Sequence, residues 1–118
     1  MDYNQHWLLI LITLLPKYKE KKMSSPLSGW KNVVGSGDRG KCSCGNWKNH
    51  WIKHCKSSWP TYCSVENCYE RAEHGAHVKN NSVSGERIIP MCSSHNNPDF
   101  TREFSIKSGT KCSDAIKD

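Results

Sequence analysis

The most regular pattern of apolar and polar positions lies in KCSCGNWKNHWIKHCK, residues 41–56. Aromatic and imidazole side chains recur there at i, i+3, i+4 and i+7, the spacing of one helix face, in Trp47, His50, Trp51 and His54. Asn46 is suited to cap this helix at its N-terminus, and the sequence Ser57-Ser58-Trp59-Pro60 to end it. The pattern predicts a short helix with an aromatic face.

Shorter runs further along the chain favour a β-hairpin. His74–Val78 reads as the end of a first strand and Glu86–Met91 as a second strand. The intervening Asn80–Gly85 is rich in turn-forming residues and is expected to be a loop. His74 and His77 are three residues apart, so they are expected to point to opposite faces of the first strand.

The segment after the hairpin predicts two smaller elements. A helix is expected to start near Ser93 and to stay short, because Pro98 interrupts it. Phe104 and Ile106 then alternate with polar residues, which predicts a last strand over residues 101–107 with a structural role.

The first 40 residues differ in composition from the rest. The apolar run Trp7–Leu15 has nine residues, whereas a helix that crosses a bilayer needs about 20. Residues 1–22 are therefore expected to be an extension outside the fold, with a membrane-associated anchor as the less favoured alternative. Residues 23–40 are rich in Ser and Gly, so little regular structure is expected there. The folded domain is expected over residues 41–118.

Four soft ligands occur in two close pairs, Cys63-x4-Cys68 and Cys92-x2-His95. Each pair allows one turn of backbone to aim two side chains at the same ion, and the hairpin between the pairs can bring them together. This spacing favours a tetrahedral structural Zn²⁺ site, with ordinary buried cysteines or disulfide partners as the alternative. Cys42-x-Cys44 beside His50 and His54 is a weaker candidate for a second metal site.

The cysteine count also bears on the compartment. Seven cysteines cannot all pair within one chain, which favours a reducing, cytoplasmic compartment with metal. A chain of 118 residues with 36% hydrophobic residues has a thin core, so a metal is expected to support its folding. Cys55 and Cys112 have no partner at a characteristic spacing and are interpreted as incidental thiols.

The positive charge of the chain is concentrated around the expected helix. The net charge is +6, and residues 30–56 hold six Lys or Arg against one acid, Asp38. Lys48, Lys53 and Lys56 belong mostly to the faces away from the aromatic one, where they are candidates for phosphate contacts with nucleic acid. The alternative is a solvated face that serves solubility.

The region from Cys63 to Phe100 resembles the His-Me finger, or HNH, endonuclease superfamily. The segment Ile88-Ile-Pro-Met-Cys92-Ser-Ser-His95-Asn96 is similar to the family's stretch that ends in a zinc-binding pair and a metal-binding residue. The resemblance implies a small α+β fold: a zinc-stapled treble-clef or ββα domain, here with a short basic helix before it. Ala76 and Arg87 stand where many family members carry other residues.

The resemblance also implies a chemistry. His77 falls at the general-base position late on the first strand, and Asn96, with Asp99 as a further oxygen donor, falls where the family binds Mg²⁺ or Mn²⁺. A neutral imidazole would activate water while the cation neutralises charge on the phosphate. The expected function is metal-dependent cleavage of nucleic acid, DNA rather than RNA, without a small-molecule cofactor. The alternative is a non-catalytic zinc module that binds nucleic acid or a protein.

Overall fold

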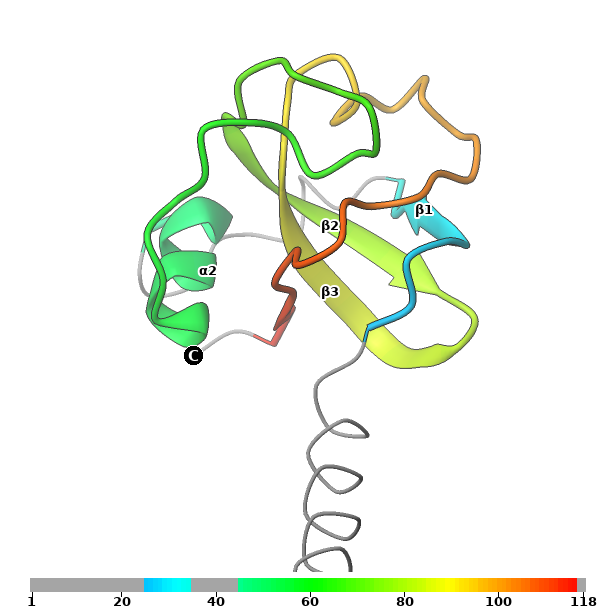
Figure 1. The fold of residues 1–118 in the computed structure, drawn as a ribbon. Coiled ribbons are helices and arrows are strands. Elements are labelled where there is room, and N and C mark those ends of the chain that lie inside the picture. Colours follow the sequence, from blue (N-terminus) through cyan, green and yellow to red (C-terminus); the bar gives the residue numbers. More distant parts are fainter. Residues whose placement is uncertain (1–24, 35–44, 117–118) are drawn as a thin grey trace, which may run out of the picture.

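The computed structural model describes residues 25–34 and 45–116. In these residues one helix, α2 (Trp47–Cys55), packs against a four-stranded antiparallel sheet, which confirms the expected small α+β fold. The strands lie side by side in chain order: β1 (Trp30–Asn32), β2 (His74–Asn80), β3 (Val83–Met91) and β4 (Ser113–Asp114) (Figure 1). The expectations for residues 1–22 and for Cys42 and Cys44 lie outside the described residues.

The hairpin of β2 and β3 is longer than the sequence predicts. Asn80 pairs with Val83, so the expected loop over Asn80–Gly85 shrinks to a turn at residues 81 and 82. The Asn80 side chain accepts a hydrogen bond from the amide of Ser82 at 2.9 Å, which stabilises this turn. Gly85 has a φ of 75° and lies in a bulge, where β3 has more residues than the β2 segment opposite.

The register of the hairpin gives the sheet two different faces. Ala76 pairs with Ile89, and His74 with Met91, so these residues share one face, from which Ala76, Ile89 and Met91 enter the main core. His77 pairs with Ile88 on the other face. His74 and His77 thus point to opposite faces, as predicted.

Trp30 of β1 is completely buried in the core. Its indole Nε1 donates to the carbonyl of Pro26 at 2.8 Å, and its backbone exchanges two hydrogen bonds with Phe104, at 3.1 and 2.9 Å. The expectation of little regular structure over residues 23–40 is therefore wrong for Trp30–Asn32. The Ser/Gly-rich segment contributes a strand and, among the described residues, the largest fully buried side chain.

Helix α2 covers the second face of the sheet. As predicted, Asn46 caps it: the Asn46 side chain accepts from the amide of Asn49 at 2.7 Å. His50 and Trp51 are buried, and the indole of Trp51 donates to the carbonyl of Lys111 at 2.8 Å. The helix ends at Cys55, and Lys56 takes the left-handed conformation that often terminates helices.

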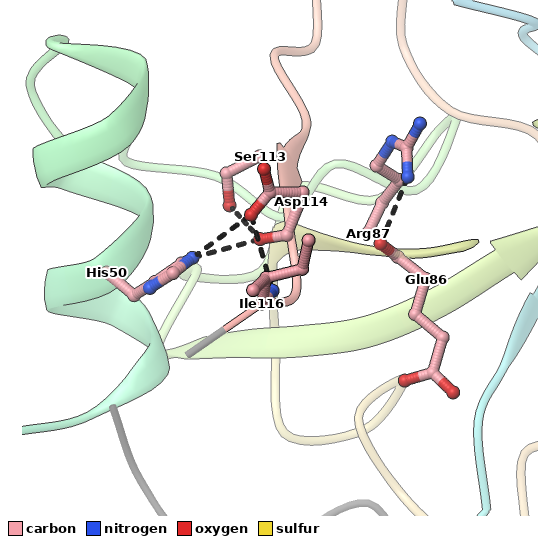
Figure 2. Close-up of polar contacts among 6 residues, drawn as sticks. All are labelled: His50, Glu86, Arg87, Ser113, Asp114 and Ile116. Atoms are coloured by element: carbon pink, nitrogen blue, oxygen red, sulfur yellow. Dashed lines mark hydrogen bonds and ion pairs between the residues drawn. The ribbon is translucent and has the colours of Figure 1, made fainter. Parts of the chain in front are cut away.

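Strand β4 is attached to this helix through His50, which points from α2 toward Asp114 (Figure 2). The His50 Nε2 atom lies 2.9 Å from the Asp114 carbonyl oxygen and 3.8 Å from Asp114 Oδ1. Because a carbonyl can only accept, Nε2 must carry a proton. Arg87 of β3 turns the other way, and its Nη1 donates to the carbonyls of Ser84 and Glu86 at 2.7 and 3.2 Å.

The segment after β3 differs from the prediction. Instead of a helix from Ser93, residues 93–99 form consecutive turns. One helical hydrogen bond, from the amide of Asn96 to the carbonyl of Cys92, is made at 2.8 Å, but the Asn97 side chain then accepts from the amide of Asp99 at 2.9 Å. This side-chain bond replaces helical pairing around Pro98, which could not donate.

The predicted last strand over residues 101–107 is present only as isolated pairs. Phe104 bridges to Trp30, and Ile106 bridges to Val65. Both side chains are buried, so the predicted alternation is confirmed although a continuous strand does not form. Among the described residues, no helix is long and apolar enough to cross a membrane.

Close packing of α2 on β2 depends on Gly75. A Cβ atom built at Gly75 would lie 2.5 Å from the carbonyl carbon of Trp47 and 2.7 Å from the amide nitrogen of Lys48. Both are backbone atoms, so a side chain here can be accommodated only by moving the helix.

We predict that Gly75→Ala destabilises the fold by about 1 to 3 kcal/mol, the usual cost of overpacking. Urea denaturation followed by tryptophan fluorescence measures this. Thr101→Ala, on an exposed residue far from α2 in the chain, is the control and should change stability by less than about 0.5 kcal/mol. Equal stability of the two variants would contradict the role given to Gly75.

Candidate metal centre

Three cysteines and one histidine converge where the hairpin meets the loop before β2. The ligand atoms of Cys63, Cys68, Cys92 and His95 all lie within 4.8 Å of one another. The sulfurs of Cys68 and Cys92 are 3.9 Å apart, and His95 Nδ1 lies 3.3 Å from the Cys92 sulfur and 3.7 Å from that of Cys63. The sequence-predicted quartet is thus brought together.

These separations fit a tetrahedral ion. Bonds of about 2.3 Å to sulfur and about 2.0 Å to nitrogen place neighbouring ligand atoms about 3.5 to 3.8 Å apart. A disulfide needs sulfurs about 2.05 Å apart, so the 3.9 Å separation of Cys68 and Cys92 excludes that bond in this structure. The Cys3His cluster is compatible with a structural zinc ion.

Local hydrogen bonds explain how each ligand pair is held. The loop between Cys63 and Cys68 is closed by two backbone bonds, from Cys63 to Glu70 at 2.9 Å and from Cys68 to Val65 at 3.1 Å. Asn67 has a φ of 65°, a left-handed conformation that Asn tolerates better than most residues. Cys92 directly follows β3, and its helical bond to Asn96 forms the single turn that brings His95 back toward it.

Two distant side chains support the ligand loops, and no pattern in the sequence indicates either of them. Asn32 of β1 donates from Nδ2 to the carbonyls of His95 and Phe100, at 2.7 and 3.1 Å. Lys107 donates from Nζ to the carbonyl of Cys63 at 2.7 Å and also to that of Cys68. The turn that carries His95 is therefore hydrogen-bonded to the sheet. The loop that carries Cys63 and Cys68 is hydrogen-bonded to the segment after Ile106.

The cysteines of the cluster lie in an apolar environment, which disfavours the ionised thiolate form. Burial raises the pKa of the Cys63 thiol to about 12, although hydrogen bonds from the backbone of Val65 and Cys92 act in the opposite direction. Cys63, Cys68 and Cys92 are all buried, and His95 is half-buried against the ring of Phe100, 4.8 Å between centroids. A bound cation is the kind of group that favours ionised sulfur in such surroundings.

Cys55 and Cys112 lie outside this cluster. Burial raises the pKa of both thiols, that of Cys112 to about 11, and the positive charge of Lys111 partly offsets the effect at Cys55. Thiols of raised pKa are poor nucleophiles at neutral pH. This environment agrees with their interpretation as incidental thiols.

The predicted general base, His77, lies on the opposite face of the sheet from the core. Its side chain is 5% exposed, and its ring meets the edge of Trp47 from α2 at 4.6 Å between centroids. His74 is exposed instead, and its Nε2 lies 2.9 Å from the hydroxyl of Ser93. His77 therefore faces a helix, but the helix is α2 and not one that follows Cys92.

Asn96 and Asp99 are exposed on the turns that follow Cys92. The backbone amide of Asn96 donates to the carbonyl of Cys92, which ties this residue to the metal-cluster turn, whereas His77 belongs to β2 and packs on α2. The structure thus brings the four zinc-ligand candidates together.

The lysines of α2 lie away from its buried side. With about 100° of rotation per residue, Lys48 and Lys53 lie roughly 140° apart on a side that avoids the buried His50 and Trp51, and Lys56 follows as the C-cap. Lys53 and Lys56 are exposed, and Lys48 places its ammonium 5.2 Å from the ring centre of Trp59. The helix contains no acidic residue, so the charged side chains that it carries are all cationic.

Comparisons of the whole chain with protein-family models, with curated proteins and with solved structures find no significant match.

Proposed function

We propose that this protein is a zinc-stabilised domain that binds nucleic acid through the cationic side of α2. The observation that carries the proposal is the combination of a close Cys3His cluster with a helix that has no carboxylate, carries Lys48 and Lys53 on its solvent side, and is followed directly by Lys56. The ion would hold the loop before β2 against the end of the hairpin. The helix would contact phosphates, with a preference for DNA among nucleic acids.

The role assigned to zinc is structural. All four ligand positions are filled by protein side chains, as in structural sites, whereas catalytic zinc sites keep one position open for water or substrate. The ligand pairs come from two loops joined by long-range contacts, so an ion would hold together segments that the thin core holds only in part. Metal binding and folding should then be one equilibrium.

We predict one Zn²⁺ per chain by elemental analysis and loss of folding in Cys68→Ser and Cys92→Ser. Binding free energies of structural zinc are on the order of 10 kcal/mol, as large as the whole net stability of a typical domain. Cys55→Ser is the matched control, and it should retain zinc and its far-UV circular dichroism spectrum. A metal-free protein with an unchanged far-UV circular dichroism spectrum would contradict this proposal.

The helix surface gives a second prediction. Changing Lys48, Lys53 and Lys56 together to Gln should weaken binding to every DNA sequence alike, because lysines that meet phosphates read no base information. The slope of log K against log salt should flatten by about 0.9 for each phosphate that is no longer neutralised. The measurement is fluorescence anisotropy of a labelled duplex over a salt series.

The control for this measurement changes Lys31, Lys79 and Arg102 to Gln. These three residues are exposed, and the variant removes the same charge away from α2. The control should keep most of the affinity. If both variants bind duplex DNA equally well, the lysines of α2 serve solubility and the proposed interface is wrong.

We further propose phosphodiester cleavage as a second function, because the zinc cluster follows directly on a hairpin that carries His77, as the HNH resemblance implies. The imidazole ring of His77 packs against Trp47 of α2, the helix whose lysines would contact the phosphates. His77 would accept the proton of water, and Asn96 or Asp99 would hold Mg²⁺ or Mn²⁺. Access to His77 would require displacement of Trp47.

We predict that His77→Asn lowers plasmid cleavage in Mg²⁺ or Mn²⁺ by about 10²- to 10⁴-fold, the usual loss when a general base is removed. Zinc content and duplex affinity should stay unchanged. His74→Ala, on the other face of β2, should cut like wild type. Absence of cleavage by the wild type under either cation, or full activity of His77→Asn, would exclude this second function and leave the binding module.

A further inference from the structure

A cleft of about 260 Å³ opens where α2 ends, beside the metal cluster. Its walls come from residues 57–64, which follow α2, and from residues 107–111, which precede β4. Trp51 and Cys63 contribute to its inner wall, and both are buried. The cleft is thus bounded by the two segments that the metal cluster and the Trp51 hydrogen bond to Lys111 hold in place.

The chemistry of this cleft suits a phosphate. Six lining residues carry a hydroxyl group, two carry an ammonium group, and none carries a carboxylate. The two cations are Lys107, held by the carbonyls of Cys63 and Cys68, and Lys111, which is exposed. Hydroxyl and ammonium donors without competing carboxylates favour an anionic ligand.

Two exposed tyrosines stand at the side of the cleft. Tyr62, which also lines it, is 51% exposed, and Tyr69 is 69% exposed. Their ring centroids are 6.0 Å apart, and the Lys107 ammonium lies 4.6 Å from the ring centre of Tyr69 and 5.9 Å from that of Tyr62. Large aromatic rings held in a fixed arrangement but left open to solvent are typical of recognition surfaces.

We propose that this cleft and its two tyrosines bind a single-stranded segment of nucleic acid, with backbone phosphate at the hydroxyl and ammonium groups and bases stacked on Tyr62 and Tyr69. Aromatic platforms beside cations are how proteins hold single strands, whereas a duplex hides its base faces. The inference rests on the proposed nucleic-acid function and adds single strands to the forms of nucleic acid that the domain binds. Ser57 directly follows Lys56, so the cleft continues from the cationic side of α2.

The test measures binding of fluorescein-labelled oligonucleotides of about 12 nucleotides, single-stranded and as the matching duplex, to the full chain. Changing Tyr62 and Tyr69 together to Ala should weaken single-strand binding at least about 5-fold for each ring removed. Duplex affinity should not change, because the lysines of α2 carry it. Changing both residues to Phe keeps the stacking faces and should retain single-strand affinity.

Two single-lysine variants test the phosphate contact. Lys111→Gln should flatten the salt slope for the single strand by about 0.7, the value for one neutralised phosphate, while Lys31→Gln on β1 should leave it unchanged. Zinc content of each variant confirms that the fold is retained. If the variant with both tyrosines changed to Ala binds the single strand as tightly as wild type, this inference is wrong. Binding of the duplex by wild type would still support the proposed function in that case. Failure of wild type to bind either oligonucleotide would overturn both.

Discussion

The convergence of Cys63, Cys68, Cys92 and His95 is the constraint on which the other contacts depend. The loop before β2 and the turn after β3 are irregular in backbone conformation. Their position against each other is set by four side chains whose ligand atoms lie within 4.8 Å. Because Lys107 and Asn32 bind carbonyls of these same segments, the cluster also positions the chain after Ile106 and strand β1. The cysteines of the cluster are therefore part of the core and also connect these segments.

On the other face of the sheet, the packing depends on the close approach of α2 to β2. Gly75 lets α2 come so near to β2 that backbone lies against backbone. This brings Trp47 onto His77 and allows His50 to reach β4. A helix held at both the second and the fourth strand presents its remaining side, with the lysines, in one fixed direction. The orientation of the cationic surface follows from packing on the opposite side of the helix.

What the sequence predicts correctly is mostly local. The helix Trp47–Cys55 and its Asn46 cap follow from spacings within a few residues, and so do the two ligand pairs. Strand β1 is not predictable in this way, because its pairing with β2 and its bridge to Phe104 join residues far apart in the chain.

The turns after Cys92 depart from the predicted helix for a similar reason. Their backbone groups bond to Asn97 and to the distant Asn32, which competes with helix formation. Neither the support from Lys107 nor the cleft that it lines is visible in the spacing of residues. Contacts of this kind arise only from the folded arrangement.

The short edge strands have a consequence for the behaviour of the chain in solution. Exposed sheet edges are templates for pairing between molecules and so for aggregation. Here β4 has two residues, and β1 has three, with Trp30 already paired to Phe104 and Lys31 exposed. Among the described residues, both edge strands are therefore too short to offer a long template to a second copy.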